Sequence, residues 1–119
     1  MSDSDSTSIS QGIVGRTWEL VRIFVDEEEH VPGKGRFTMF LEPEGTARIR
    51  VDCNRAFGPY RIDREGISFG PIASTMAYCG DDSLDTDFMR LLEDSNSHLL
   101  AGEELVLISS RGRLVFSPH

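Results

Sequence analysis

The stretch Thr46-Ala47-Arg48-Ile49-Arg50-Val51 carries the clearest pattern in the chain, because apolar and charged residues alternate along it. Successive side chains of a β-strand point to opposite faces of the sheet, so the apolar residues share one face and the two arginines share the other. This pattern is typical of a half-buried antiparallel strand, with one face on a core and the other in water. The stretch therefore predicts an antiparallel β-fold.

Short apolar segments separated by turn residues continue on both sides of this strand. They are rich in β-branched, aromatic and aliphatic residues, and turn signals such as Pro43-Glu44-Gly45 divide them. Together with the strand at 46–51, the predicted strands span residues 17–25, 36–42, 46–51, 60–63, 67–69, 98–100, 104–109 and 113–117. A meander of this length is stably arranged as a strongly curved sheet or small barrel.

One amphipathic helix is expected late in the chain. An apolar stripe at helical spacing is formed by Leu84, Phe88, Leu91 and Leu92. Asp82 or Ser83 can cap its N-terminus. The fold class predicted from these patterns is α+β, mostly β: a small antiparallel β-barrel-like meander of about seven or eight strands with one helix at about 83–94.

Length and charge limit the kind of protein this is. At 119 residues the chain fits one domain, which we place at residues 13–119, after a Ser/Asp-rich tail of residues 1–12 that we expect to be disordered. The formal charge of −8 argues against general binding to nucleic acid. No apolar run is long enough to span a membrane. Without a recognisable signal peptide the sequence as written predicts a cytoplasmic protein, and a periplasmic or secreted one if an export signal has been removed.

The order and spacing of several motifs resemble the META domain, or HslJ-like, family over about residues 14–117. The motifs are Trp18-Glu19-Leu20, Cys53-Asn54-Arg55 with Gly58 and Tyr60, Ser74-Thr75 leading to Cys79, Phe88 and Leu92 of the helix, Gly102, Leu105-Val106-Leu107 and Leu114-Val115-Phe116. The chain departs from the family at Asp52, where glycine is usual, and at Ser74-Thr75-Met76-Ala77-Tyr78, where Thr-Thr and a basic residue are usual. The resemblance implies a small barrel-like domain, often exported or envelope-associated and linked to stress responses, without an agreed catalytic residue.

The two cysteines, Cys53 and Cys79, are candidates for a disulfide between two loops. A redox pair and two unpaired buried thiols remain as alternatives, although the spacing is not Cys-x-x-Cys. A zinc site is disfavoured because two cysteines without an adjacent histidine fall short of four ligands.

Basic residues suggest an interaction surface on this acidic chain. Arg48 and Arg50 share a strand face that Arg61 could extend, and such a stripe could bind an anion or an acidic partner. The alternative is that each arginine pairs with a carboxylate on a neighbouring strand. The acidic run 26–29 is interpreted as solvated surface, with docking of a basic partner as its alternative.

Other candidate sites are weaker. The alternation of Asp81, Ser83, Asp85 and Asp87 is similar to the start of a calcium loop, but Thr86 replaces the required glycine and Leu92 the bidentate glutamate. We therefore expect an acidic helix N-terminus and no metal. His30, His98 and His119 are scattered along the sequence, and no nucleophile–base motif occurs. Trp18, Phe37, Met39, Phe57 and Phe69 are expected in the core.

These observations favour a non-enzymatic interaction module related to stress or to the envelope, with no cofactor and with an unknown protein partner. A small-ligand carrier that uses the barrel interior is the second hypothesis. An enzyme of unrecognised type is the third. The sequence leaves the oligomeric state open.

Overall fold

The computed structural model describes residues 12–64 and 66–119 of the chain. In this part the chain forms ten strands and one helix. In chain order they are β1 (Thr17–Val25), β2 (Glu28–His30), β3 (Phe37–Leu41), β4 (Thr46–Val51), β5 (Asn54–Ile62), β6 (Ile67–Phe69), β7 (Ala73–Ser74), α2 (Asp85–Glu93), β8 (Ser97–Ala101), β9 (Glu104–Ile108) and β10 (Gly112–Pro118). The disordered tail predicted for residues 1–12 lies outside the described residues, except for Gly12.

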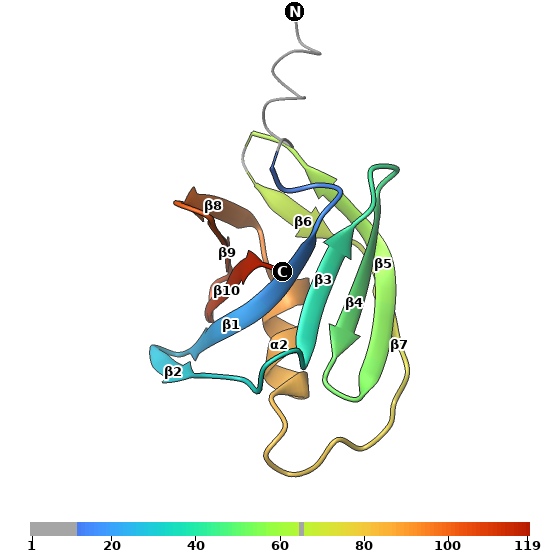
Figure 1. The fold of residues 1–119 in the computed structure, drawn as a ribbon, viewed down its shortest axis with the longest axis vertical. Helices are drawn as coiled ribbons and strands as arrows, with labels where there is room; N and C mark the ends of the chain where they lie inside the picture. The colour runs from blue at the N-terminus through green and yellow to red at the C-terminus, as the bar shows by residue number, and fades with distance from the viewer. Residues whose placement is uncertain (1–11, 65) are drawn as a thin grey trace, which may run out of the picture.

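All strand pairings are antiparallel, and the sheet follows the order β6-β5-β4-β3-β1-β10-β9-β8. The short strands β2 and β7 pair with β1 and β5 respectively. Figure 1 shows this sheet curling into a nearly closed barrel. The predicted fold class, a mostly β barrel-like meander with one helix, is confirmed.

Gly66 lies at the seam where the two ends of the sheet approach each other. A Cβ atom added there would lie 2.4 Å from Ser97 Cα and 2.5 Å from the Asn96 carbonyl oxygen. The backbone also has a φ of +153° at this position, which L side chains rarely adopt. Only glycine therefore lets the β5–β6 turn come this close to the start of β8.

The core lies between the inner face of the barrel and α2, which lies inside the curve of the sheet (Figure 1). The alternation in β4 has the predicted effect, since Ala47, Ile49 and Val51 are buried while both arginines are exposed. Phe88 of α2 is fully buried, and its ring centroid lies 5.0 Å from that of Phe37. The helix therefore fills the barrel interior with apolar side chains.

The structure differs from the predicted strands mainly at β5, which begins at Asn54, whereas the predicted strand began at residue 60. Gly58 and Pro59 act as turn signals in isolation, but both are accommodated in this strand. A Cβ at Gly58 would lie 2.7 Å from the Pro71 carbonyl oxygen, so glycine is required where the chain after β6 crosses β5. Pro59 pairs with Thr46, the first residue of β4, and its carbonyl accepts a hydrogen bond from Gly70 N.

Three further expectations were wrong. β2 lies between the first two predicted strands, where no strand was expected, because Asp26 and Glu27 adopt positive φ values of 50° and 71° and close a hairpin without glycine. Phe57 is not a core residue, since it is 60% exposed on the outer face of β5. The helix N-cap is Leu84, whose side chain forms no capping hydrogen bond, and neither predicted residue occupies this position. Ser83 lies one residue earlier, where its hydroxyl accepts a hydrogen bond from Asp85 N at 3.2 Å and donates to Asp52 Oδ2 at 2.6 Å.

Candidate functional site

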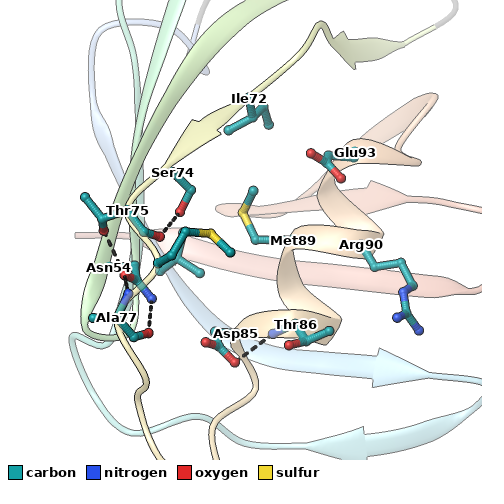
Figure 2. A pocket seen from close by; sticks show the side chains of 12 residues that line it. Asn54, Ile72, Ser74, Thr75, Ala77, Asp85, Thr86, Met89, Arg90 and Glu93 are labelled. Carbon is teal, nitrogen blue, oxygen red and sulfur yellow. Dashed lines mark hydrogen bonds between the residues drawn. The ribbon is translucent and has the colours of Figure 1, made fainter.

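A groove lies between α2 and the segment of chain that contains β7, and Asn54 fixes one of its walls. Asn54 Oδ1 accepts hydrogen bonds from Thr75 Oγ1 at 2.8 Å and from Ala77 N at 2.7 Å. Its amide nitrogen donates to the Ala77 carbonyl at 2.9 Å. Figure 2 shows these bonds holding residues 75–77 in place across from the helix. The Asn54 side chain thus continues the pairing of β5 with β7 beyond the last backbone pair.

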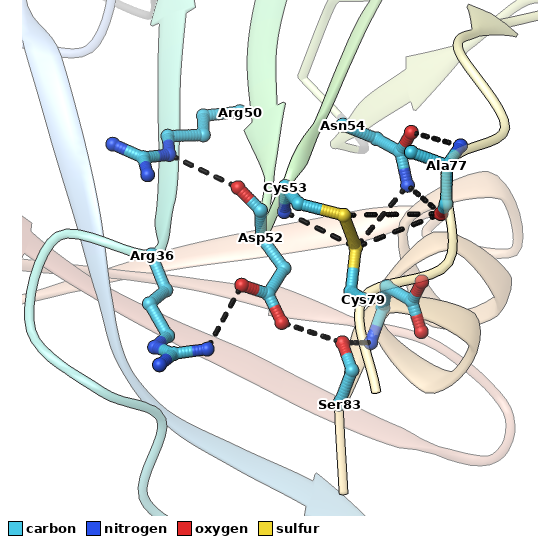
Figure 3. Close-up of polar contacts among 9 residues, drawn as sticks. Arg36, Arg50, Asp52, Cys53, Asn54, Ala77, Cys79 and Ser83 are labelled. Carbon is cyan, nitrogen blue, oxygen red and sulfur yellow. Dashed lines mark hydrogen bonds and ion pairs between the residues drawn. A yellow bond between two sulfur atoms is a disulfide. The ribbon is translucent and has the colours of Figure 1, made fainter. Parts of the chain in front are cut away.

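The disulfide adds a covalent restraint to the same wall. Cys53 and Cys79 are bonded, with their Cα atoms 5.6 Å apart, so the predicted bridge is present (Figure 3). Cys53 N donates to Cys79 Sγ at 3.2 Å, and the Asn54 amide nitrogen donates to the same sulfur at 3.4 Å. The end of β4 and the chain before α2 are therefore joined by a bond and a local hydrogen-bond network.

Asp52 organises the other side of this junction, and sequence reasoning missed its role. Its carboxylate is buried and accepts hydrogen bonds from Arg36 Nη1 at 3.0 Å and Ser83 Oγ at 2.6 Å. Its carbonyl accepts one from Arg50 Nε at 3.0 Å (Figure 3). The φ of Asp52 is +59°, in the left-handed region where glycine is favoured and aspartate is tolerated. The glycine usual in the family at this position offers the same conformation, and the aspartate adds links to Arg36, just before β3, and to Ser83, two residues before α2.

The predicted arginine surface lies on the outer face of β4 and β5, but Arg61 is not part of it. Arg48 pairs across the strands with Phe57, and Arg50 pairs with Arg55. Arg61 points to the same side of β5 by alternation, but it lies beyond the end of β4 and pairs with Ser68 of β6. The side chains that the structure brings together are therefore Arg48, Arg50, Arg55 and Phe57, which we call the arginine face.

A shallow groove of about 580 Å³ runs over the arginine face, and Thr38 and Phe40 of β3 complete it. Arg48 is held by Glu42, with an Nε–Oε2 distance of 2.7 Å, so for this residue the alternative of carboxylate pairing holds. Arg50 uses only its Nε, and the guanidinium of Arg55 forms no ion pair or hydrogen bond with the described residues. The groove therefore combines two incompletely paired cations with exposed aromatic surface.

The histidines of the chain do not form a common site. His98 lies in β8, and its Nδ1 is buried without a hydrogen-bond partner among the described residues. Burial lowers the pKa of His98, and the nearby Asp63 carboxylate opposes this shift only in part. Within residues 12–64 and 66–119, no three His, Cys, Asp or Glu side chains are grouped so that they could hold a metal ion. No helix in this part of the chain is long and apolar enough to cross a membrane.

Comparison with known proteins places the chain by family and by fold. The model of the META domain matches residues 11–119. An NMR structure of a protein from Burkholderia xenovorans superposes with a TM-score of 0.75 at 19% identity, covering 94% of this chain and 87% of the other. A crystal structure of a DUF4847 family protein from Bacteroides vulgatus superposes with a TM-score of 0.68 at 12% identity, covering 92% and 96% of the two chains. No curated protein gives a significant match. At these identities the structural likenesses show the fold alone.

Proposed function

The chain belongs to the META domain family, and from this premise we propose that it is a non-enzymatic interaction module that binds a protein partner through the arginine face. The partner presents acidic side chains together with an aromatic or aliphatic side chain. Following the family resemblance, we place this binding in a stress- or envelope-related process.

The observation that carries this proposal is the direct pairing of Arg50 with Arg55. Like charges at opposed positions on neighbouring strands destabilise a sheet, typically by a few tenths of a kcal/mol to about 1 kcal/mol. No carboxylate of the described residues is bonded to the terminal nitrogens of either guanidinium. A carboxylate supplied by a partner would bridge the two cations and remove the repulsion.

Phe57 supplies the apolar part of the same surface. Its side chain is 60% exposed between Arg48 on β4 and Ala73 on β7. Aromatic and arginine side chains are the residue types that contribute most at protein interfaces, because both bury large areas and arginine forms several hydrogen bonds. The arginine face therefore has the composition of a binding surface, although the chain as a whole carries a formal charge of −8.

The two other hypotheses lack an observation of this kind. The inward side chains of Trp18, Phe37 and Phe88 are fully buried and occupy the space that a carrier would need. For an enzyme, the groove over the arginine face offers cations, apolar surface and threonine hydroxyls, but none of its described lining residues is a histidine, cysteine or carboxylate that could act as a base.

We further propose that the protein works in an oxidising compartment, the periplasm or the exterior of the cell. The support is the disulfide between Cys53 and Cys79, since such bonds persist where thiols are not kept reduced. Alkylation of free thiols in intact source cells, read by mass spectrometry, tests this. Alkylated Cys53 and Cys79 would contradict the oxidising assignment.

Fluorescence anisotropy with a fluorescein-labelled peptide of sequence Asp-Glu-Phe-Asp-Glu tests the binding proposal. The double variant Arg50→Glu/Arg55→Glu is expected to bind about tenfold more weakly or worse, because charge-assisted hydrogen bonds contribute about 1.5–3 kcal/mol each. Arg111→Glu/Arg113→Glu is the matched control with the same change in charge, and it should bind like the wild type. Arg61→Glu shows whether the surface extends along β5. Equal weakening by the double variant and its control would contradict the proposal.

A further inference from the structure

The groove between β7 and α2 is separate from the arginine face and has a volume of about 620 Å³. This lies within the range of about 300–1,000 Å³ that is usual for binding pockets. The residues that carry the argument are Val51, Ile72, Ser74, Met76, Met89 and Glu93. One wall of the groove is the backbone of an edge strand and the other is the surface of a helix.

The strand wall presents unused backbone hydrogen-bonding groups to the groove. β7 pairs with β5 and with no other described strand. Thr75 N donates to the Arg55 carbonyl at 3.0 Å, so residues 73 and 75 direct their backbone groups towards β5. Because these directions alternate along a strand, Ser74 directs its N–H and C=O away from β5, to the unpaired edge. This is the edge to which another strand can add.

The edge is held open rather than covered by the helix. Asn54 bonds to Thr75 and Ala77, and Cys79 is tied to Cys53, so the chain after β7 is fixed to the start of β5 and to the residue before it. Met76, in the middle of this segment, is 91% exposed. A fixed edge lowers the entropy lost when a peptide binds to it.

The helix wall determines the chemistry of the occupant. Figure 2 shows Met89 and Glu93 of α2 pointing towards β7, while Arg90, which also lines the groove, points away from β7. Met89 and Ile72 are partly buried and Val51 is buried, which gives the groove an apolar floor. Asp85 also lines the groove, so acidic side chains from both ends of α2 contribute to its rim. Methionine adapts to differently shaped apolar side chains.

We propose that this groove binds an extended peptide segment in which apolar and basic side chains alternate, and that the segment adds as a strand to the free edge of β7. The backbone of the peptide pairs with Ser74. Its apolar side chains contact the floor at Met89, and its lysine or arginine side chains lie near Asp85 and Glu93. Strand addition of this kind takes affinity from main-chain hydrogen bonds and specificity from alternate side chains.

The test uses the full chain and a fluorescein-labelled peptide, Lys-Val-Lys-Val-Lys, with a capped C-terminus. Two companion peptides are N-methylated, one at both valines and one at all three lysines. Both companions keep the charge and the apolar surface. Each lacks the backbone N–H donors on one edge of the strand: one companion on the edge formed by the valines, the other on the edge formed by the lysines. Anisotropy titration should show saturable binding of the parent peptide and a loss of about tenfold or more for one of the two companions, because the groove then holds an unpaired Ser74 carbonyl.

Variants of the protein locate the site. Ser74→Pro removes the edge N–H and should weaken binding of the parent peptide about tenfold, with circular dichroism to verify that the variant folds. Glu93→Lys should also weaken it, whereas Glu103→Lys in the turn between β8 and β9 carries the same charge change and should not. Arg50→Glu/Arg55→Glu should leave this binding intact, which separates the groove from the arginine face. Equal binding of all three peptides, or equal effects of Glu93→Lys and Glu103→Lys, would overturn the proposal.

Discussion

Removal of the Cys53–Cys79 bond should lower stability by an amount that follows from the position of the two cysteines in the chain. The bridge closes a loop with a sequence separation of 26 residues. In the chain-entropy treatment, a loop of this length restricts the unfolded state by about 12 cal/mol/K, or about 3.5 kcal/mol at 25 °C. For a chain of 119 residues, the unfolding entropy near the midpoint converts this into a fall in Tm of about 15 °C.

The assay is thermal unfolding followed by circular dichroism, with the oxidised protein, the reduced protein and Cys53→Ser/Cys79→Ser compared at one pH. The serine hydroxyl at position 79 can still accept from the backbone N–H of residue 53, so the variant isolates the covalent bond. Reductant should leave the Tm of the variant unchanged. A fall below about 5 °C in both the reduced protein and the variant would refute the reasoning, because it would mean that the loop is already restricted without the bond.

Three further predictions concern single side chains. Asn54→Ala should destabilise the protein by about 2–4 kcal/mol in urea unfolding, because the buried Asn54 forms bonds with Thr75 and Ala77. A loss below about 1 kcal/mol would contradict the role of Asn54 in fixing the chain after β7. Arg55→Glu should raise stability by about 0.5 kcal/mol, since it places an opposite charge across from Arg50, yet it should weaken binding of the acidic peptide. Burial lowers the pKa of His98, so the folded chain binds fewer protons than the unfolded chain and stability falls as the pH drops below 6.5. Urea midpoints between pH 7.5 and 5.5 should therefore fall more for the wild type than for His98→Phe.

The elements that could be predicted are those whose local pattern agrees with their environment. β1, β4 and β6 have the predicted limits, because each alternates or is bounded by turn residues on both sides. β5 could not be predicted from its own residues. Gly58 is required there because the Pro71 carbonyl lies close to it, and Pro59 is tolerated because it pairs with Thr46, the first residue of the neighbouring strand. Both are contacts between segments distant in sequence.

The same distinction, between local pattern and contacts distant in sequence, applies to the candidate sites. Arg48 and Arg50 were predicted to share a face because the period of a strand is local. Arg61 rather than Arg55 was predicted to extend this face, because the place of Arg55 depends on the register between β4 and β5 and on the unexpected early start of β5. The role of Asp52 had one signal in the sequence, the charged residue at a position where the resembled family has glycine. The groove beside β7 had none, because it depends on how α2 is placed against an edge strand.

The central claim, that the chain binds an acidic partner through the arginine face, is tested most directly by NMR titration of the ¹⁵N-labelled protein with the Asp-Glu-Phe-Asp-Glu peptide. Amide signals of Thr38, Arg50, Arg55 and Phe57 should shift in a saturable way, and added salt should reverse the shifts because they depend on charge. The signals of α2 should stay in place. Unchanged signals on β4 and β5, or shifts centred elsewhere in the chain, would contradict the account.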